Sequence, residues 1–304
     1  NHTETAMGSR MLNRWLALPL KNLEEINSRT DVVSFFLENQ NFFELVKSNI
    51  NQIGDLERLV SKTSTLRINP REIEKLKYSL ISLSPIKKAC LESDMSILVS
   101  LGNNIDLCND LVEKIENELV ENPPVFLHKG DVINKGVNIE LDDLKEIKNS
   151  GKILLDKMLQ NEIDKTSISS LKISFNNVFG YYLEVRNIHK DKVPENWIRK
   201  QTLVNAERYI TPELKDYESK ILSAQNDISI IENKIYSKLV ATIAEKTILL
   251  QKNAQIISRL DCLLSFSKIA NKFNYSKPIL NNNCDLKIIK GRHPVIEQQL
   301  DSLK

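Results

Sequence analysis

Two long helical patterns enclose one short stretch of strand-like sequence, and this arrangement limits the fold more than any other feature of the chain. The first pattern runs from about residue 141 to 163 and the second from 212 to about 251, with apolar residues three and four positions apart. This spacing is typical of a coiled-coil seam. Helices whose near ends join through one inserted module must run antiparallel, and about 40 helical residues span roughly 60 Å. The sequence therefore predicts a small module at the tip of a long two-helix arm.

The inserted stretch has the pattern of a β-hairpin. Residues 171–176 alternate apolar and polar side chains, and residues 181–186 repeat the alternation after a turn that extends to Gly180. A period of two is typical of a strand with one buried face. Asn and Gly favour the tight turn between two such strands.

Hydrogen-bond donors are dense in the part of the module that follows. They surround the apolar Leu203, Val204 and Ala206 within ten positions. The donors that we select as candidates for contact with a polyanion are Arg199, Lys200, Gln201, Thr202, Asn205 and Arg208. Cations mixed with neutral donors are typical of phosphate contacts, whereas base readout needs side chains placed in a groove. We therefore expect binding that is independent of sequence and that weakens steeply with salt.

The local charge supports this expectation better than the net charge of the chain does. Residues 165–208 hold eight lysines and arginines against four acids, while the whole chain has a net charge of +2. Such a local bias indicates a surface that faces phosphates. Weaker candidates in the same stretch are Lys172, Arg186, Lys190 and Lys192.

Other interpretations of these residues stay open at this point. The cations could be solvated surface charges, and Asn205 and Glu207 could cap or pair within the module. His189 and Trp197 could stack on bases, although Trp197 is better explained as an anchor that holds the loop on a small apolar core.

The rest of the chain is predominantly helical. Apolar stripes at helical spacing recur through residues 1–119, as expected for a helical bundle. Residues 122–138 are rich in Pro and Gly and predict a crossing loop with short strands, and residues 256–273 predict a helix that returns to the bundle. Leu286, Ile288 and Ile289 predict a strand that begins a different domain.

The composition argues against several other classes of protein. Only 8 Gly and 9 Pro among 304 residues favour long helices. The four Cys lack metal-ligand spacing, so we expect neither a zinc site nor a disulfide framework, and we expect a reducing compartment. No apolar run approaches the roughly 18 residues of a membrane span, and no signal peptide is recognisable. No carboxylate dyad or nucleophile–histidine set is present.

Five segments, in one order along the chain, carry a family resemblance. They are TAMGSRMLNRWLALPL from Thr5, GDLERL at Gly54–Leu59, FNNVFGYYLEV from Phe175, RKQTLVNAERYITPELKDYESKI from Arg199 and GRHPVIE at Gly291–Glu297. Together they resemble the MutS family of bacterial DNA mismatch-recognition proteins, over nearly the whole chain.

The resemblance implies a mainly α fold, in which a helical-bundle core carries a long antiparallel two-helix lever arm with a small β-rich clamp at its tip. The implied divisions are core at 1–139, lever helix at 140–164, clamp at 165–211, second lever helix and return to the core at 212–275, and the start of an incomplete ATPase domain at 276–304. The family's mismatch-reading and connector domains would precede Asn1, so we expect this chain to be a piece of a longer protein.

The resemblance also implies function. The clamp would close on the backbone of double-stranded DNA, two subunits would encircle the duplex, and a MutL-type repair protein would be a partner in the cytoplasm, close to the nucleoid. ATP and Mg²⁺ would bind outside this chain, because no G-x-x-x-x-G-K-[ST] motif occurs in it. We therefore expect a DNA-binding fragment that has no enzymatic activity. The alternative is a structural coiled-coil module whose β tip binds a protein; such a surface would be apolar at its centre and charged at its rim.

Overall fold

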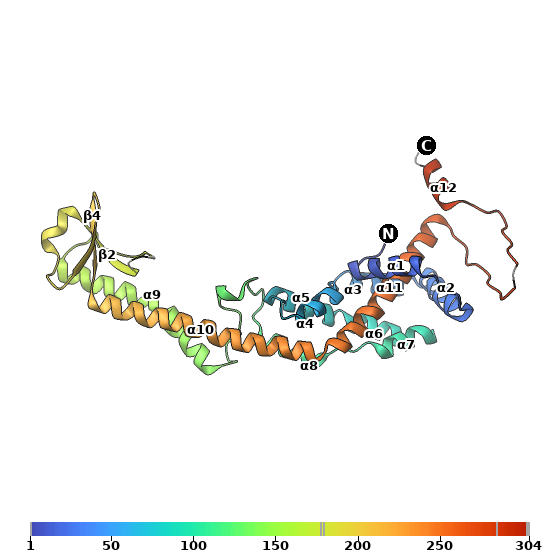
Figure 1. The fold of residues 1–304 in the computed structure, drawn as a ribbon, viewed down its shortest axis with the longest axis horizontal. Helices are drawn as coiled ribbons and strands as arrows, with labels where there is room; N and C mark the ends of the chain where they lie inside the picture. The colour runs from blue at the N-terminus through green and yellow to red at the C-terminus, as the bar shows by residue number, and fades with distance from the viewer. Residues whose placement is uncertain (1, 177, 179, 284, 302–304) are drawn as a thin grey trace.

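A helical bundle and a small β-sheet lie at opposite ends of an elongated molecule, joined by a pair of long helices (Figure 1). The computed structural model describes residues 2–176, 178, 180–283 and 285–301. The predicted architecture, mainly α with a β-rich tip, is confirmed. The bundle contains α1 Ala6–Ala17, α2 Leu23–Glu38, α3 Gln40–Ile50, α4 Leu56–Ser64, α5 Pro70–Ile81, α6 Leu83–Leu91, α7 Ser96–Asn104, α8 Asn109–Glu118 and α11 Thr247–Phe273.

Several helices begin where the sequence provides capping side chains. Asn69 accepts a hydrogen bond from the Glu72 N–H while the Glu72 carboxylate accepts one from the Asn69 N–H, and Pro70 occupies the first turn. Asp55 caps α4 and Thr211 caps α10. Each side chain satisfies an N–H group that has no partner inside the helix.

Helix α11 passes through the bundle and packs on α1, α2, α3, α4 and α7. Its residues from Ile256 to Leu264 are almost all buried, and two polar side chains among them, Ser258 and Asp261, have hydrogen-bond partners. Asp261 accepts hydrogen bonds from the N–H groups of Glu4 and Thr5, at 2.8 Å each, and from the Thr5 hydroxyl. This buried carboxylate fixes the start of α1 on α11, although 256 residues separate Thr5 from Asp261.

The two long helices of the arm are α9 Ile139–Thr166 and α10 Pro212–Glu245. They run side by side between the bundle and the sheet (Figure 1). Leu214, Tyr217 and Ile221 are buried on the α10 face that packs on α9, and Gly151 permits a close approach because a Cβ there would lie 2.5 Å from the Tyr217 hydroxyl. The predicted antiparallel pair is confirmed.

The predicted end of the second helix is wrong. We expected it to continue to about residue 251, but α10 ends at Glu245, and α11 begins at Thr247. The change of direction at Lys246 has local causes: the Thr247 hydroxyl donates to the Ala244 carbonyl, and the Lys246 ammonium lies 2.7 Å from Asp110 of α8.

The crossing loop between α8 and α9 attaches the arm to the bundle. It contains the 3-10 turn Leu127–Lys129 and one isolated bridge between Leu119 and Ile133 rather than full strands. Glu232 of α10, with 1% of its side chain exposed, pairs with Lys145 of α9 at 2.8 Å. It also accepts from the Val132 N–H at 3.2 Å. One buried carboxylate therefore holds both arm helices and the loop together.

The predicted strand near the end of the chain is wrong as well. Leu286, Ile288 and Ile289 lie in a segment without regular structure, with 87%, 72% and 73% of their surface exposed. A strand requires a neighbouring strand for its backbone groups, and the only sheet among the described residues lies at the far end of the molecule (Figure 1). A helix follows instead, α12 Pro294–Asp301.

Candidate nucleic-acid interface

Four antiparallel strands form the sheet at the tip of the arm, which we call the tip sheet. They are β1 Lys172–Asn176, β2 Gly180–Arg186, β3 Ile198–Thr202 and β4 Ala206–Ile210. The order across the sheet is β1-β2-β4-β3, and the predicted hairpin is the β1–β2 pair. Residues 177 and 179 of its turn lie outside the described part of the chain.

A small apolar core holds the tip sheet on the arm. Its buried members are Ile168, Leu171, Leu183, Val185, Trp197, Tyr209 and Leu214. The Trp197 ring is 6% exposed and lies 5.9 Å from the Tyr209 ring. The interpretation of Trp197 as an anchor is therefore confirmed, and its buried ring is not available for stacking on bases.

A polar row crosses the opposite face of the sheet. Strand register places Lys172 beside Glu184, Glu184 beside Arg208, and Arg208 beside Gln201. Arg208 donates to Gln201 Oε1 at 2.8 Å, and its Nε lies 3.6 Å from Glu184. Its guanidinium also lies over the Tyr182 ring, 4.5 Å from the centroid, a favourable cation–π geometry.

Arg208 is therefore largely used within the sheet. Only 19% of its side chain is exposed, and its partners neutralise or cover most of the guanidinium. Its part in contacting a polyanion should be smaller than its charge suggests.

A second group of predicted cations gathers around Glu207. The Glu207 carboxylate, 2% exposed, lies 3.1 Å from Lys190 and 3.4 Å from Arg199, and it accepts a short hydrogen bond from the Tyr209 hydroxyl. This hydrogen bond, followed by the charges of Lys190 and Arg199, lowers the pKa of Glu207. Burial and the same hydrogen bond raise the pKa of Tyr209 to about 12.

The Glu207 group leaves excess positive charge at the surface. One buried carboxylate faces two cations whose side chains are 52% and 58% exposed. Lys190 and Arg199 are thus fixed in position, yet their ammonium and guanidinium groups still reach solvent. The open interpretation that Glu207 pairs within the module is confirmed.

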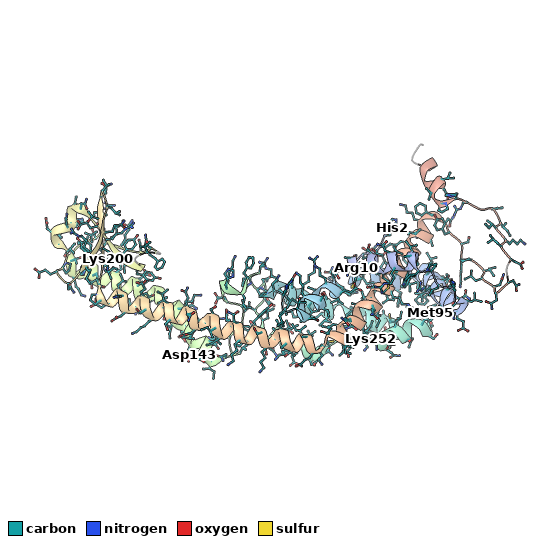
Figure 2. The ribbon with its side chains drawn as sticks, viewed as in Figure 1. His2, Arg10, Met95, Asp143, Lys200 and Lys252 are labelled. Carbon is teal, nitrogen blue, oxygen red and sulfur yellow. The ribbon has the colours of Figure 1, made fainter. Side chains whose placement is uncertain are left out.

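The remaining candidates lie on the exposed side of β3 and the turn that follows it. Lys200 falls at the register shift between Arg199 and Gln201, and it is exposed, as are Thr202 and Asn205. Within the described part of the chain Lys200 makes no ion pair. Figure 2 shows Lys200 at the end of the molecule opposite to Arg10 and Met95.

The weaker candidates separate into two groups. Lys172, Arg186 and Lys192 are exposed, and no ion pair involves them among the described residues. Lys190 instead belongs to the Glu207 group. The tip sheet therefore offers the cations of Arg199, Lys200 and Lys190 near β3, with Lys172 at the outer edge on β1.

The sequence did not predict the contacts that divide the donors into the polar row around Arg208 and the group around Glu207. The stacking of Arg208 on Tyr182 and the support of the β3–β4 turn by Asn187 were not foreseen. The Asn187 side chain donates to the Val204 carbonyl at 2.9 Å. The period-two alternation of β2 and β4 places Tyr182 and Arg208 on one face, so the register was the signal that could have revealed that pair.

The described residues also show which other types of site they form. No group of three or more His, Cys, Asp or Glu side chains in that part of the chain is arranged to hold a metal ion. None of the helices described is at once long enough and apolar enough to cross a membrane. Cys90, Cys108 and Cys262 are buried free thiols, and Cys284 lies outside the described residues.

Comparison with known proteins gives one consistent result. The family model described as MutS domain III matches residues 1–267. The chain is 50% identical over 300 residues to the DNA mismatch repair protein MutS of Bacteroides thetaiotaomicron, covering 99% of this chain and 35% of the relative. It is 52% identical over 298 residues to the protein of that name from Flavobacterium psychrophilum, covering 98% of this chain and 34% of the relative.

The chain thus spans about a third of the length of these curated relatives, which are named as DNA mismatch repair proteins. The family model covers the bundle, the arm and the tip sheet together. On these grounds, the chain belongs to the MutS family.

Proposed function

We propose that this chain is the part of a MutS-type mismatch repair protein that grips duplex DNA through its backbone. The observation that carries the proposal is the exposed group of Arg199, Lys200 and Lys190 beside the neutral donors Thr202 and Asn205. Cations and hydroxyl or amide donors together suit phosphate oxygens. Because the relatives of this chain are named DNA mismatch repair proteins, we take the polyanion to be DNA.

The arm suggests how this contact would serve the whole protein. Two packed helices join the tip sheet to the bundle (Figure 1), so a change at one end can be transmitted as movement of a stiff element. In the longer protein we expect an ATPase domain that binds ATP and Mg²⁺, two subunits around the duplex, and a MutL-type partner. The division of this chain into core, lever and clamp belongs to the same proposal.

A titration with labelled DNA tests the proposed contact. A homoduplex and the same duplex with one mismatch are titrated with the chain at low and moderate salt. We expect equal binding to both, because the proposed contacts are with phosphates, and a steep loss of affinity with salt. A double variant, Arg199→Gln/Lys200→Gln, should weaken binding at least about tenfold at low salt, since each lost phosphate contact also removes released counterions.

A matched control uses two cations of the bundle. Arg67→Gln/Lys252→Gln removes the same charge from exposed positions between α4 and α5 and on α11, remote from the tip sheet, and it should leave the affinity within about twofold. Equal weakening by both double variants would show that only total charge matters, and absence of binding at low salt would refute the proposed contact. Binding of a protein instead of DNA through the tip sheet would favour the coiled-coil alternative.

A further inference from the structure

A second cationic site lies in the bundle, remote from the tip sheet. Helices α1, α2, α7 and α11 border an open cavity of about 610 Å³. Three arginines from three different helices line it: Arg14 of α1, Arg29 of α2 and Arg259 of α11. This volume is within the range of sites that bind small molecules.

The arginines of this cavity are not held in ion pairs. In the described part of the chain none of the three makes an ion pair, and the Nε of Arg259 is buried without a hydrogen-bond partner. A buried donor that is left unpaired costs free energy, as does a second cation nearby. Burial, followed by the positive charge of Arg259, lowers the pKa of Arg29, and the charge of Glu25 opposes this shift.

Aromatic packing fixes one of the cations in place. The Arg29 guanidinium lies over the Trp15 ring, 3.6 Å from the centroid, and Trp15 in turn contacts Phe266 of α11 with a centroid distance of 6.1 Å. Glu25 is the only acid among the lining residues, so the lining keeps a formal charge of +2. The cavity therefore combines an excess of positive charge with the neutral donors Ser28 and Gln255.

We propose that this cavity binds a phosphorylated small molecule. Guanidinium groups present paired N–H donors that match the oxygens of phosphate, and they hold their charge at every physiological pH. Several guanidinium groups around one cavity suit a multiply charged group such as a diphosphate better than a single carboxylate. The proposal does not depend on DNA binding by the tip sheet, because the two sites lie at opposite ends of the molecule.

The chain provides its own reporter for this site. It contains two tryptophans, so Trp197→Phe leaves Trp15 as the only one. Pyrophosphate is titrated into that variant at constant ionic strength, balanced with chloride, while tryptophan fluorescence is recorded. We expect a saturable change with a Kd of about 1 mM or tighter. A signal that follows ionic strength alone, or no saturable change, would overturn the proposal.

Variants then test the residues and the chemistry. Arg259→Gln should weaken pyrophosphate binding at least about tenfold, and Arg67→Gln, an exposed control in the same bundle, should leave it within about twofold. If circular dichroism shows that Arg259→Gln disturbs the fold, Arg259→Lys keeps the charge without the paired donors and should still weaken binding measurably. Equal effects of Arg259→Lys and Arg67→Gln would refute the role of Arg259. Binding of malonate as tight as that of pyrophosphate would refute the phosphate class.

Discussion

At the scale of single residues, Glu207 determines how much positive charge the tip sheet presents. It is buried between two exposed cations and the Tyr209 hydroxyl. Its carboxylate both orders Lys190 and Arg199 and cancels one of their charges. Glu207 therefore orders the two cations but lowers the net positive charge of the tip sheet. A substitution that removes only the charge of Glu207 separates these two effects.

Replacement of Glu207 by Gln keeps an acceptor for Tyr209 but removes the negative charge. If phosphates meet Lys190 and Arg199, DNA binding by the variant should be tighter at low salt. The slope of log K against log salt should steepen by up to about 0.9, the value for one more neutralised phosphate. Fluorescence anisotropy over a salt series measures both quantities. Weaker binding by a variant that is still folded would contradict the proposed arrangement.

The Glu207–Tyr209 pair also predicts how the stability of the tip sheet depends on pH. Because the pKa of Glu207 is lowered, its contribution is complete above about pH 4.3, the value of a free glutamate, and is lost as the pH falls through the lowered value. Because the pKa of Tyr209 is raised to about 12, its contribution is complete below about pH 10 and is lost as the pH rises through 12.

Trp197 fluorescence in a Trp15→Phe background follows the tip sheet through both ranges. Glu207→Gln should remove the part of the acid transition that belongs to this pair. Tyr209→Phe should remove one of the tyrosines whose ionisation lies above pH 10 in an absorbance titration. An alkaline titration that is unchanged in Tyr209→Phe would show that the pair does not form.

Gly8 controls the contact between the first helix and α11. A Cβ at this position would lie 2.1 Å from Asp261 Oδ2 and 2.7 Å from its Cγ, so Gly8→Ala must displace a buried carboxylate from its donors. We expect a loss of about 2–4 kcal/mol in the free energy of unfolding. Asn13→Ala, an exposed control on the same helix, should change it by about 0.5 kcal/mol or less. Urea unfolding of both variants makes the comparison.

At the scale of elements, a buried ionic contact secures the root of the arm. Glu232 of α10 joins Lys145 of α9 and the crossing loop. Its removal would leave Lys145 and two backbone N–H groups without their partner. Apolar packing, the hydrogen bond from Lys145 to the Ile133 carbonyl and the exposed charge of Asp131 near Lys145 and Lys148 would remain.

Glu232→Ala should therefore cost about 3 kcal/mol, as expected when one member of a buried pair is removed. Amide hydrogen exchange should rise first in residues 130–133. Glu92→Ala breaks an exposed pair with Lys88 and should cost less than about 1 kcal/mol. Unchanged exchange in the crossing loop of Glu232→Ala would contradict the role assigned to this contact.

Elements in which apolar side chains repeat at a regular period are predicted correctly from the sequence. Features that depend on contacts between residues distant in the chain are not. The arm and the β1–β2 hairpin follow from periods of 3.6 and 2, which local sequence specifies. The face of the sheet on which each β3 donor lies cannot be predicted from the sequence. The register shift at Lys200 breaks the alternation of side chains along β3 and pairs Arg208 with Gln201. The segment containing Leu286 has the composition of a strand, but no adjacent strand among the described residues pairs with it.

At the scale of the whole molecule, the two apolar cores are separate. One holds the bundle and the root of the arm, and the other holds the tip sheet together with the adjacent ends of the arm helices. Each core has one tryptophan: Trp15 packs against the bundle core, and Trp197 is a member of the core of the tip sheet. Units with separate cores can unfold separately.

We therefore predict two unfolding transitions. The tip sheet has the smaller core, so the Trp197 signal of a Trp15→Phe variant should change at lower urea than the Trp15 signal of a Trp197→Phe variant. Coincident midpoints would mean that the arm couples the two ends into one cooperative unit. Circular dichroism on the same samples reports loss of the helices independently.

The point at which the arm is anchored in the bundle also determines how far the tip sheet moves when the arm tilts. Ile228 is the residue of α10 nearest to the tip sheet that belongs to the bundle core, and Pro212 is 16 residues away, about 24 Å at 1.5 Å per residue. A tilt of about 10° at that anchorage moves the base of the sheet by about 4 Å, which is more than the roughly 3 Å length of a hydrogen bond. If the tip sheet binds DNA as proposed, a tilt of about 10° at Ile228 would decide whether Lys200 and Arg199 reach a phosphate, far from any atom of the ligand.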